Sequence, residues 1–171
     1  MKRSTFPPLF ILIVAAIVAT TSTSAAIVPE HGPSAFGAGQ FRFRSQQSER
    51  TELWSFSFEA IANKNGRPRG RAHFENLTAQ TQVVVRINCL SVFSGINRGA
   101  VMTGQVLHSD DPGLPKLATV IFAATDGPFP PFDSDTITPL FVFVPLPGED
   151  CHDTQPLTIL PVENGDISIQ P

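Results

Sequence analysis

Two short segments of this chain gather the side chains that most often bind cations or transfer protons. Carboxylates suit hard cations and imidazoles suit transition metals, so the two segments could form one divalent cation site if the fold brought them together. Neither segment has the spacing of a calcium loop or a zinc motif, and acidic side chains in loops commonly serve solvation and local hydrogen bonds. We therefore expect no cofactor, with a divalent cation as the alternative. The candidate metal ligands are His108, Asp110, Asp111, Asp150, His152 and Asp153.

Nucleophilic catalysis has little support. The G-x-S-x-G turn of many hydrolases does not occur, and Ser94 has the surroundings of a hairpin turn residue. His73 lies in an alternating stretch of Arg, His and Glu, which is typical of an exposed strand face. His31 lies in a segment rich in Gly and Pro and is expected to be solvated. We assign no catalytic residue and favour a non-enzymatic protein over an enzyme.

Cys89 and Cys151 are the two cysteines of the chain. Two thiolates are too few for a structural zinc site, and their wide separation differs from a redox Cys-x-x-Cys pair. An even number of cysteines in an exported chain favours a disulfide. We predict a bond between Cys89 and Cys151, which would close a loop of about sixty residues and stabilise the fold by roughly 4 kcal/mol in the chain-entropy model.

The expectation of export comes from the N-terminal segment. Lys2 and Arg3 precede an apolar run over residues 9–19, and small residues then lead to Ala26. The run is about half as long as a membrane-spanning helix, so it can engage the export machinery without anchoring the product. We predict a cleaved signal peptide at residues 1–26 and a secreted, periplasmic or extracellular product with no stable membrane span.

The charge of the chain limits its partners. It has 12 Lys and Arg against 15 Asp and Glu, a net charge of −3, and loses Lys2 and Arg3 with the signal. Nucleic acid is therefore not expected as a partner. Residues 27–98 hold most of the basic side chains, whereas residues 99–171 hold only Lys116 against most of the acids. We expect the halves to neutralise each other within the fold, with a basic binding face as the alternative.

Alternation of apolar and polar residues predicts strands early in the mature chain. Phe41 and Phe43 alternate with arginines, and residues 54–60 place Trp and Phe side chains on one face. After the turn-forming residues 63–66, residues 69–75 alternate again. We predict a hairpin whose outer face carries the stripe of Arg, His and Glu.

Residues 81–94 predict the longest strand, with the apolar side chains up to Cys89 on one face. After Cys89 the apolar set moves by one position to Leu90 and Val92. Such a phase change predicts a β-bulge, which would bend the strand. A second hairpin is expected around residues 95–99.

Later strands are predicted from composition and turn residues. Residues 116–124 are almost continuously apolar or small, which predicts a strand buried on both faces or at a crowded corner of the sheet. Residues 135–144 predict another strand, with Pro139 at an edge or a bulge because proline cannot donate to the ladder. A final hairpin is expected over residues 157–169, with its turn at Asn164 and Gly165.

The expected fold is a single all-β domain over residues 40–171, preceded by a flexible Gly and Pro leader at residues 27–39. The pattern predicts one antiparallel β-barrel or β-sandwich of about eight to nine strands. Both architectures need the same alternation, and the phase change near Cys89 favours a curved, barrel-like sheet.

Sugar binding through aromatic platforms is not indicated. The chain has no Tyr, and its single tryptophan, Trp54, alternates in phase with core phenylalanines. Asn76 begins an N-glycosylation sequon, which would matter only in a eukaryotic host.

Several short motifs together suggest a family. They are residues 37–41, 56–60, 70–74, 87–92 and 135–138. With this Gly-rich start, "FSF" strand, "GR" strand, Cys-bearing strand and late Asp-bearing strand, the chain resembles small uncharacterised exported β-domains, mostly bacterial. The resemblance implies export and an all-β fold, and it implies no activity or functional residue.

The sequence therefore favours an exported, non-enzymatic β-domain that acts as a structural or binding module. The alternative is a small-ligand carrier or an enzyme that uses the mouth of a β-barrel, with or without a bound cation.

Overall fold

The computed structural model describes most of the domain as β-strands. It describes residues 32–44, 49–63, 65–95, 97–128, 132–144, 151–152 and 158–171, so the predicted signal peptide lies outside it. The long strands are β1 (Ser34–Arg44), β2 (Thr51–Ala62), β3 (Pro68–Asn76), β4 (Thr81–Ser94), β5 (Arg98–Ser109) and β6 (Thr119–Asp126). The shorter strands are β7 (Thr136–Ile137), β8 (Phe141–Val142), β9 (Leu160–Pro161) and β10 (Asn164–Gln170).

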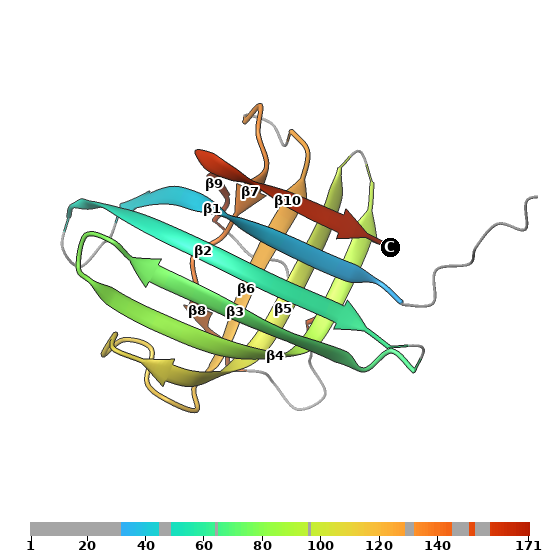
Figure 1. Cartoon of the computed structure of the whole chain (residues 1–171), viewed down its shortest axis with the longest axis horizontal. Helices are drawn as coiled ribbons and strands as arrows, with labels where there is room; N and C mark the ends of the chain where they lie inside the picture. Colours follow the sequence, from blue (N-terminus) through green and yellow to red (C-terminus); the bar gives the residue numbers. More distant parts are fainter. Residues whose placement is uncertain are drawn as a thin grey trace, which may run out of the picture.

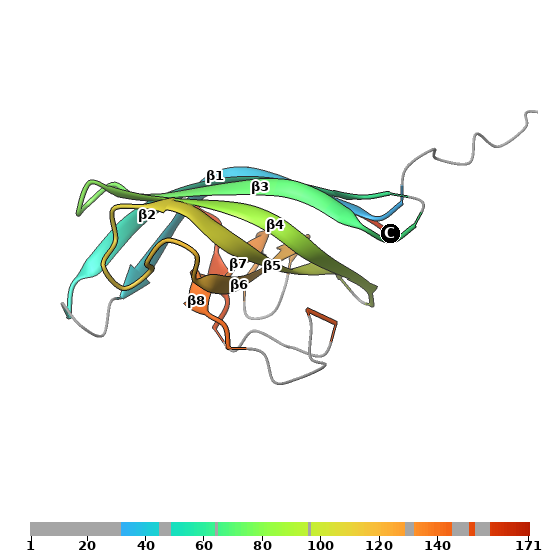
Figure 2. The same ribbon diagram turned by 90° about the horizontal axis from the view of Figure 1, so that it is seen from below.

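All these strands belong to one antiparallel sheet. Nine of them follow one another in the order β10-β1-β2-β3-β4-β5-β6-β7-β9, and β8 also pairs with β6. The sheet is curled into a half-barrel, with β10, β1, β2, β3 and β4 in front and β5 and β6 crossing behind (Figure 1). Figure 2 shows the resulting arch from below. The predicted all-β antiparallel fold is confirmed, and the curved sheet is the form it takes.

Two irregularities in the pairing of β4 with β5 bend the sheet. The register shifts between Val84 and Val85, and again between Ile87 and Cys89. A bulge bends its strand and increases local twist, so these shifts turn the sheet from the front layer to the back layer. The predicted bulge near Cys89 is confirmed. It precedes Cys89 rather than following it, so Cys89 packs in a different cluster from Ile87.

Phenylalanine rings fill the concave side of the sheet. Phe122 on β6 meets Phe58 and Phe74 edge-on, with ring centroids 5.7 and 5.3 Å apart. The predicted hairpin of β2 and β3 is confirmed, since Phe58 pairs with Ala72 and Phe56 with Phe74. The small Ala72 leaves room for the ring opposite it, so the front and back layers meet through aromatic contacts.

The strand β6 is buried on both faces, as predicted. Phe122 and Ala124 face the main core, while Ile121 and Ala123 face a second cluster that includes Cys151. Phe141, Phe143 and Cys151 therefore cover part of the outer side of the back layer. The outer side of the front layer has no such cover among the described residues.

The first strand begins earlier than expected. β1 starts at Ser34, inside the predicted flexible leader, and pairs with β2 and β10 over residues 34–40. The glycines there predict flexibility, but in the structure Gly37 and Gly39 lie in close packing. A Cβ atom on Gly37 would lie 2.7 Å from a ring carbon of Phe58, so only glycine fits under this ring.

The predicted C-terminal hairpin is wrong. Asn164 and Gly165 belong to β10, which pairs with β1, while β9 pairs with β7. Gly165 has a positive φ of 140°, and a Cβ on it would collide with the Ala38 carbonyl. Glycine is therefore required here for close approach to β1 rather than for a two-residue turn.

The predicted strand over residues 135–144 is interrupted at Pro139. β7 and β8 lie on either side of this proline, and both pair with β6. Thr138 supplies both hydrogen bonds to β6 at this point. Its backbone N–H donates to the Ala123 carbonyl, and its hydroxyl accepts the Ala123 N–H at 2.9 Å. The expectation that Pro139 marks an irregular position is confirmed.

Side chains close the gap between the last strand and the back layer. The carboxylate of Asp135 accepts the N–H groups of Gly127 and Ile167, at 2.8 and 2.7 Å. Asp126 accepts the N–H of Ile169 at 3.0 Å, and Arg98 donates to the Ile169 carbonyl at 3.5 Å. These groups bind the edge of β10 that β1 leaves unpaired, so carboxylates replace a backbone ladder there.

We predict that Asp135→Ala lowers the free energy of unfolding by about 2–4 kcal/mol, because two partly buried N–H groups lose charge-assisted partners. Urea unfolding of the mature protein measures this. Asp133→Ala is the control, since Asp133 is exposed nearby and should change stability by less than about 0.5 kcal/mol. Equal effects of the two substitutions would contradict the role given to Asp135.

Candidate functional site

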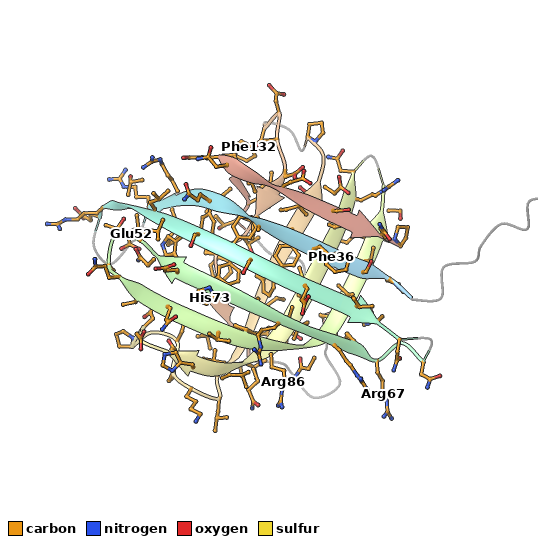
Figure 3. The ribbon with its side chains drawn as sticks, viewed as in Figure 1. Phe36, Glu52, Arg67, His73, Arg86 and Phe132 are labelled. Atoms are coloured by element: carbon orange, nitrogen blue, oxygen red, sulfur yellow. A yellow bond between two sulfur atoms is a disulfide. The ribbon has the colours of Figure 1, made fainter. Side chains whose placement is uncertain are left out.

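The outer face of the front layer carries the charged stripe predicted from sequence. Arg71 and His73 on β3 face outward, with Glu59 and Ser57 of β2 as their partners in the sheet. On the other side of β3, Arg71 pairs with Arg86 of β4. Figure 3 shows His73 and Arg86 on this face. Alternation along three adjacent strands therefore collects polar side chains on one exposed surface.

A shallow depression lies in this surface. It has a volume of about 270 Å³ and is lined by Ser57, Phe58, Glu59, Arg71 and His73. Ser57 has a short side chain, and its partner on β1 is Ala38, so the surface is low between the longer side chains. The Phe58 side chain points to the core, where it is 5% exposed.

Several charged groups at the depression have no partner among the described residues. Arg71 and Glu59 are directly opposite each other, yet their side chains form no ion pair or hydrogen bond within the described chain. Arg86 donates to Gln105 at 3.0 Å, which orients its guanidinium and leaves other N–H groups exposed. The surface therefore offers guanidinium N–H donors of Arg71 and Arg86 and the Glu59 carboxylate as an acceptor, none of which is paired with another of these three side chains.

The arrangement lacks the geometry of a catalytic dyad. Ser57 and His73 are partners in the sheet, but no hydrogen bond joins them, and His73 Nε2 lies 3.2 Å from Gln82 Oε1. A serine nucleophile needs a base within hydrogen-bond reach that a third group orients. Here the imidazole lies against the Gln82 amide and forms no hydrogen bond with the Ser57 hydroxyl.

The two charged halves of the sequence meet in part. Arg42 on β1 and Glu163 form an ion pair at 3.0 Å, and Arg98 contacts the last strand as described above. Arg71 and Arg86 are not neutralised in this way by described residues. The expected neutralisation between the halves is therefore seen for Arg42, while Arg71 and Arg86 lie opposite each other on the outer side of β3 and β4.

The candidate cation ligands do not gather at one point among the described residues. His108 Nε2 lies 3.2 Å from Asp110 Oδ1 at the exposed end of β5. Asp111 is nearby, and its carboxylate accepts the N–H of Gly113 at 2.8 Å. His152 lies beside the Cys89 and Cys151 sulfurs instead. Asp150 and Asp153 lie outside the described residues.

The cysteines are paired as predicted. The Sγ atoms of Cys89 and Cys151 are 2.02 Å apart, at the distance of a disulfide bond. Cys89 pairs with Thr103 on β5, and His108 lies roughly 17 Å further along that strand at the usual rise per residue. The ligand atoms of Cys89, Cys151 and His152 lie within 4.8 Å of one another, but sulfurs joined to each other are not thiolate ligands.

Trp54 and the sequon residue Asn76 are used in the structure. Glu52 accepts the Trp54 indole N–H at 3.2 Å and an Asn76 amide N–H at 2.8 Å. The Asn76 side-chain oxygen Oδ1 accepts the N–H groups of Thr78 and Ala79. Asn76 is only 4% exposed. The Asn76 side-chain amide is therefore engaged in hydrogen bonds within the fold. Trp54 packs against the core, as predicted.

Sequence reasoning identified the stripe on β3 but missed its neighbours. The pattern predicts Ser57 on the outer face of the same hairpin, but it places Phe36 in the leader and does not connect Arg86 with Arg71. Alternation could have placed Arg86 on the outer face, because it is out of phase with Val85 and Ile87. Only strand pairing places these residues next to one another.

No protein-family model, curated protein or solved structure matches this chain. The resemblance to small exported bacterial β-domains therefore stays a prediction. Within the described ranges, no helix has the length and apolar character needed to cross a membrane.

We predict that both cysteines of the mature protein resist alkylation until a reductant is added, as measured by mass spectrometry. The double substitution Cys89→Ser and Cys151→Ser should lower the free energy of unfolding by about 4 kcal/mol, because the unfolded chain loses a loop constraint. Free reaction of both thiols without reductant would contradict the disulfide. Ser91→Ala, on the same strand, is the control.

Proposed function

We propose that this protein is an exported, non-enzymatic binding module that presents the outer face of its front layer to a ligand. The observation that carries the proposal is the depression lined by Ser57, Glu59, Arg71 and His73. It combines unused donors with an unused acceptor on a rigid sheet. Such groups gain hydrogen bonds from a ligand without first breaking internal ones.

The packing of the interior favours a ligand site on the outer face rather than one at the mouth of the half-barrel. Phe56, Phe58, Phe74 and Phe122 form a continuous set of ring contacts between the layers. A carrier that uses the interior needs an apolar cavity for its ligand. Where rings meet at 5–6 Å, a ligand of that kind would have to displace core side chains.

Strand position also supports a binding surface. β2 and β3 are interior strands, each paired on both sides, so their backbones are held by two ladders. Side chains on such strands keep their relative positions when a ligand arrives. A preorganised surface loses less conformational entropy on binding than a surface made of loops.

The export part of the proposal rests on the N-terminal signal pattern and on the paired cysteines. Disulfides persist in oxidising compartments outside the cytoplasm.

We predict that Ser57→Trp weakens ligand binding by at least about tenfold, because the larger side chain fills the depression. The measurement uses immobilised neutral oligosaccharides, acidic oligosaccharides and peptides probed with the mature protein. Ser94→Trp is the control, since Ser94 is exposed at the end of β4, outside the depression. Binding that survives Ser57→Trp would contradict the site. Turnover of a panel member that disappears in His73→Gln would contradict the non-enzymatic role.

A further inference from the structure

One row of side chains crosses the front layer through the depression. Phe36 on β1 pairs with Glu59 on β2, Glu59 with Arg71 on β3, and Arg71 with Arg86 on β4. Adjacent strands are about 4.8 Å apart, so the row spans roughly 14 Å. Phe36 and Arg86 are labelled at its two ends in Figure 3. The row presents, in order, an aromatic ring, a carboxylate and two guanidinium groups.

The guanidinium groups of Arg71 and Arg86 would be stabilised by a bound anion. Like charges directly opposite each other on neighbouring strands destabilise a sheet. Arg71 and Arg86 occupy such positions, and no described carboxylate forms an ion pair with either. A carboxylate on the ligand could accept charge-assisted hydrogen bonds from both forks and remove the repulsion.

Glu59 and Phe36 would bind other groups of the same ligand, namely a hydrogen-bond donor and an apolar surface. An ionised carboxylate only accepts hydrogen bonds, so Glu59 needs a donor such as a hydroxyl. Phe36 is 36% exposed, although its ring is large and apolar. No aromatic platform is indicated by the sequence, but Phe36 lies exposed on this face, and the C–H face of a sugar ring would cover it and remove apolar surface from water.

We propose that the ligand of this face is an acidic sugar chain, in which carboxylates are spaced among hydroxyl groups. This inference rests on the proposed binding role of the outer face. The carboxylate binds between Arg71 and Arg86, hydroxyls donate to Glu59, and one sugar ring packs on Phe36. Ser57 and Ala38 keep the surface low enough for a flat chain to lie across the strands.

Other anionic polymers fit the row less well. A peptide that adds as a strand needs an open sheet edge, whereas β2 and β3 are paired on both sides. A densely charged polymer would be repelled by Glu59 and by the net negative charge of the chain. A chain with one carboxylate per sugar ring has a lower charge density than such a polymer, and its hydroxyls can donate to Glu59, so both penalties are smaller.

The test compares tetragalacturonate with its methyl ester, which keeps the same sugar rings and removes the charge. Titration calorimetry with the mature protein should show binding of the acid that is at least about tenfold tighter than binding of the ester, since only the acid accepts charge-assisted bonds. The preference should shrink in high salt, because exposed charges are screened. Equal binding of acid and ester would overturn the inference.

Three substitutions test the row itself. Arg71→Gln and Arg86→Gln should each weaken tetragalacturonate binding by at least about tenfold, while Arg44→Gln, which removes the same charge at the far end of β1, should not. Glu59→Gln should also weaken binding if Glu59 accepts a hydroxyl. Tighter binding by Glu59→Gln, or equal binding of polyglutamate, would show a general polyanion surface and overturn the sugar assignment.

Failure of this inference can be told apart from failure of the proposed function. If another panel ligand binds and Ser57→Trp abolishes that binding, the outer face is a site and only its ligand was misassigned. If tetragalacturonate binds but Ser57→Trp has no effect, both proposals are wrong. Melting curves of all variants control for folding, and Arg71→Gln should melt no lower than the wild type because it relieves repulsion.

Discussion

The edge of β10 is the point at which this sheet either closes or stays open. Its N–H groups at Ile167 and Ile169 face away from β1, and unpaired groups of this kind are costly when buried and invite pairing with other chains when exposed. Carboxylates of Asp135 and Asp126 bind these two N–H groups. The sheet is thereby closed by side chains, across a gap that backbone pairing does not bridge. The half-barrel and its filled interior depend on this contact between the first and last parts of the sheet.

Closure determines which surface remains available. Once the front and back layers meet, the phenylalanines of both fill the space between them, with Phe122 central to the contacts. On the outer side of the back layer, Phe141, Phe143 and Cys151 pack against Ile121 and Ala123, and the disulfide joins Cys151 to β4. The outer face of β1–β4 is left as the broad exposed surface of the described structure. A search for function therefore leads to side chains that the core does not use.

Two arginines on that face, Arg71 and Arg86, form no ion pair with a described carboxylate. Arg42 and Glu163 show that this chain pairs a basic residue of its first half with an acid of its second half where the strands permit. Arg71 and Arg86 instead lie opposite each other. Residues that are unfavourable for folding and favourable for recognition are expected at binding sites, because the ligand supplies the missing partner. The placement of this pair, rather than the total charge, distinguishes the surface.

Local patterns along the chain were enough to predict the strand class, the hairpin of β2 and β3, the two-sided burial of β6 and the bulge near Cys89, because each depends on side-chain period or composition within a few residues. The same local reasoning misjudged glycine. Gly37 and Gly165 were assigned to a leader and a turn, whereas they lie beneath Phe58 and the Ala38 carbonyl, and nothing local distinguishes a flexible glycine from one required by a distant neighbour. The row across the outer face could not be predicted from local sequence either, because its residues come from four different strands.

The sequence by itself determined which residues alternate outward on each strand. Only the tertiary structure decided which strands are neighbours, because register depends on long-range packing, and therefore which outward residues form a site.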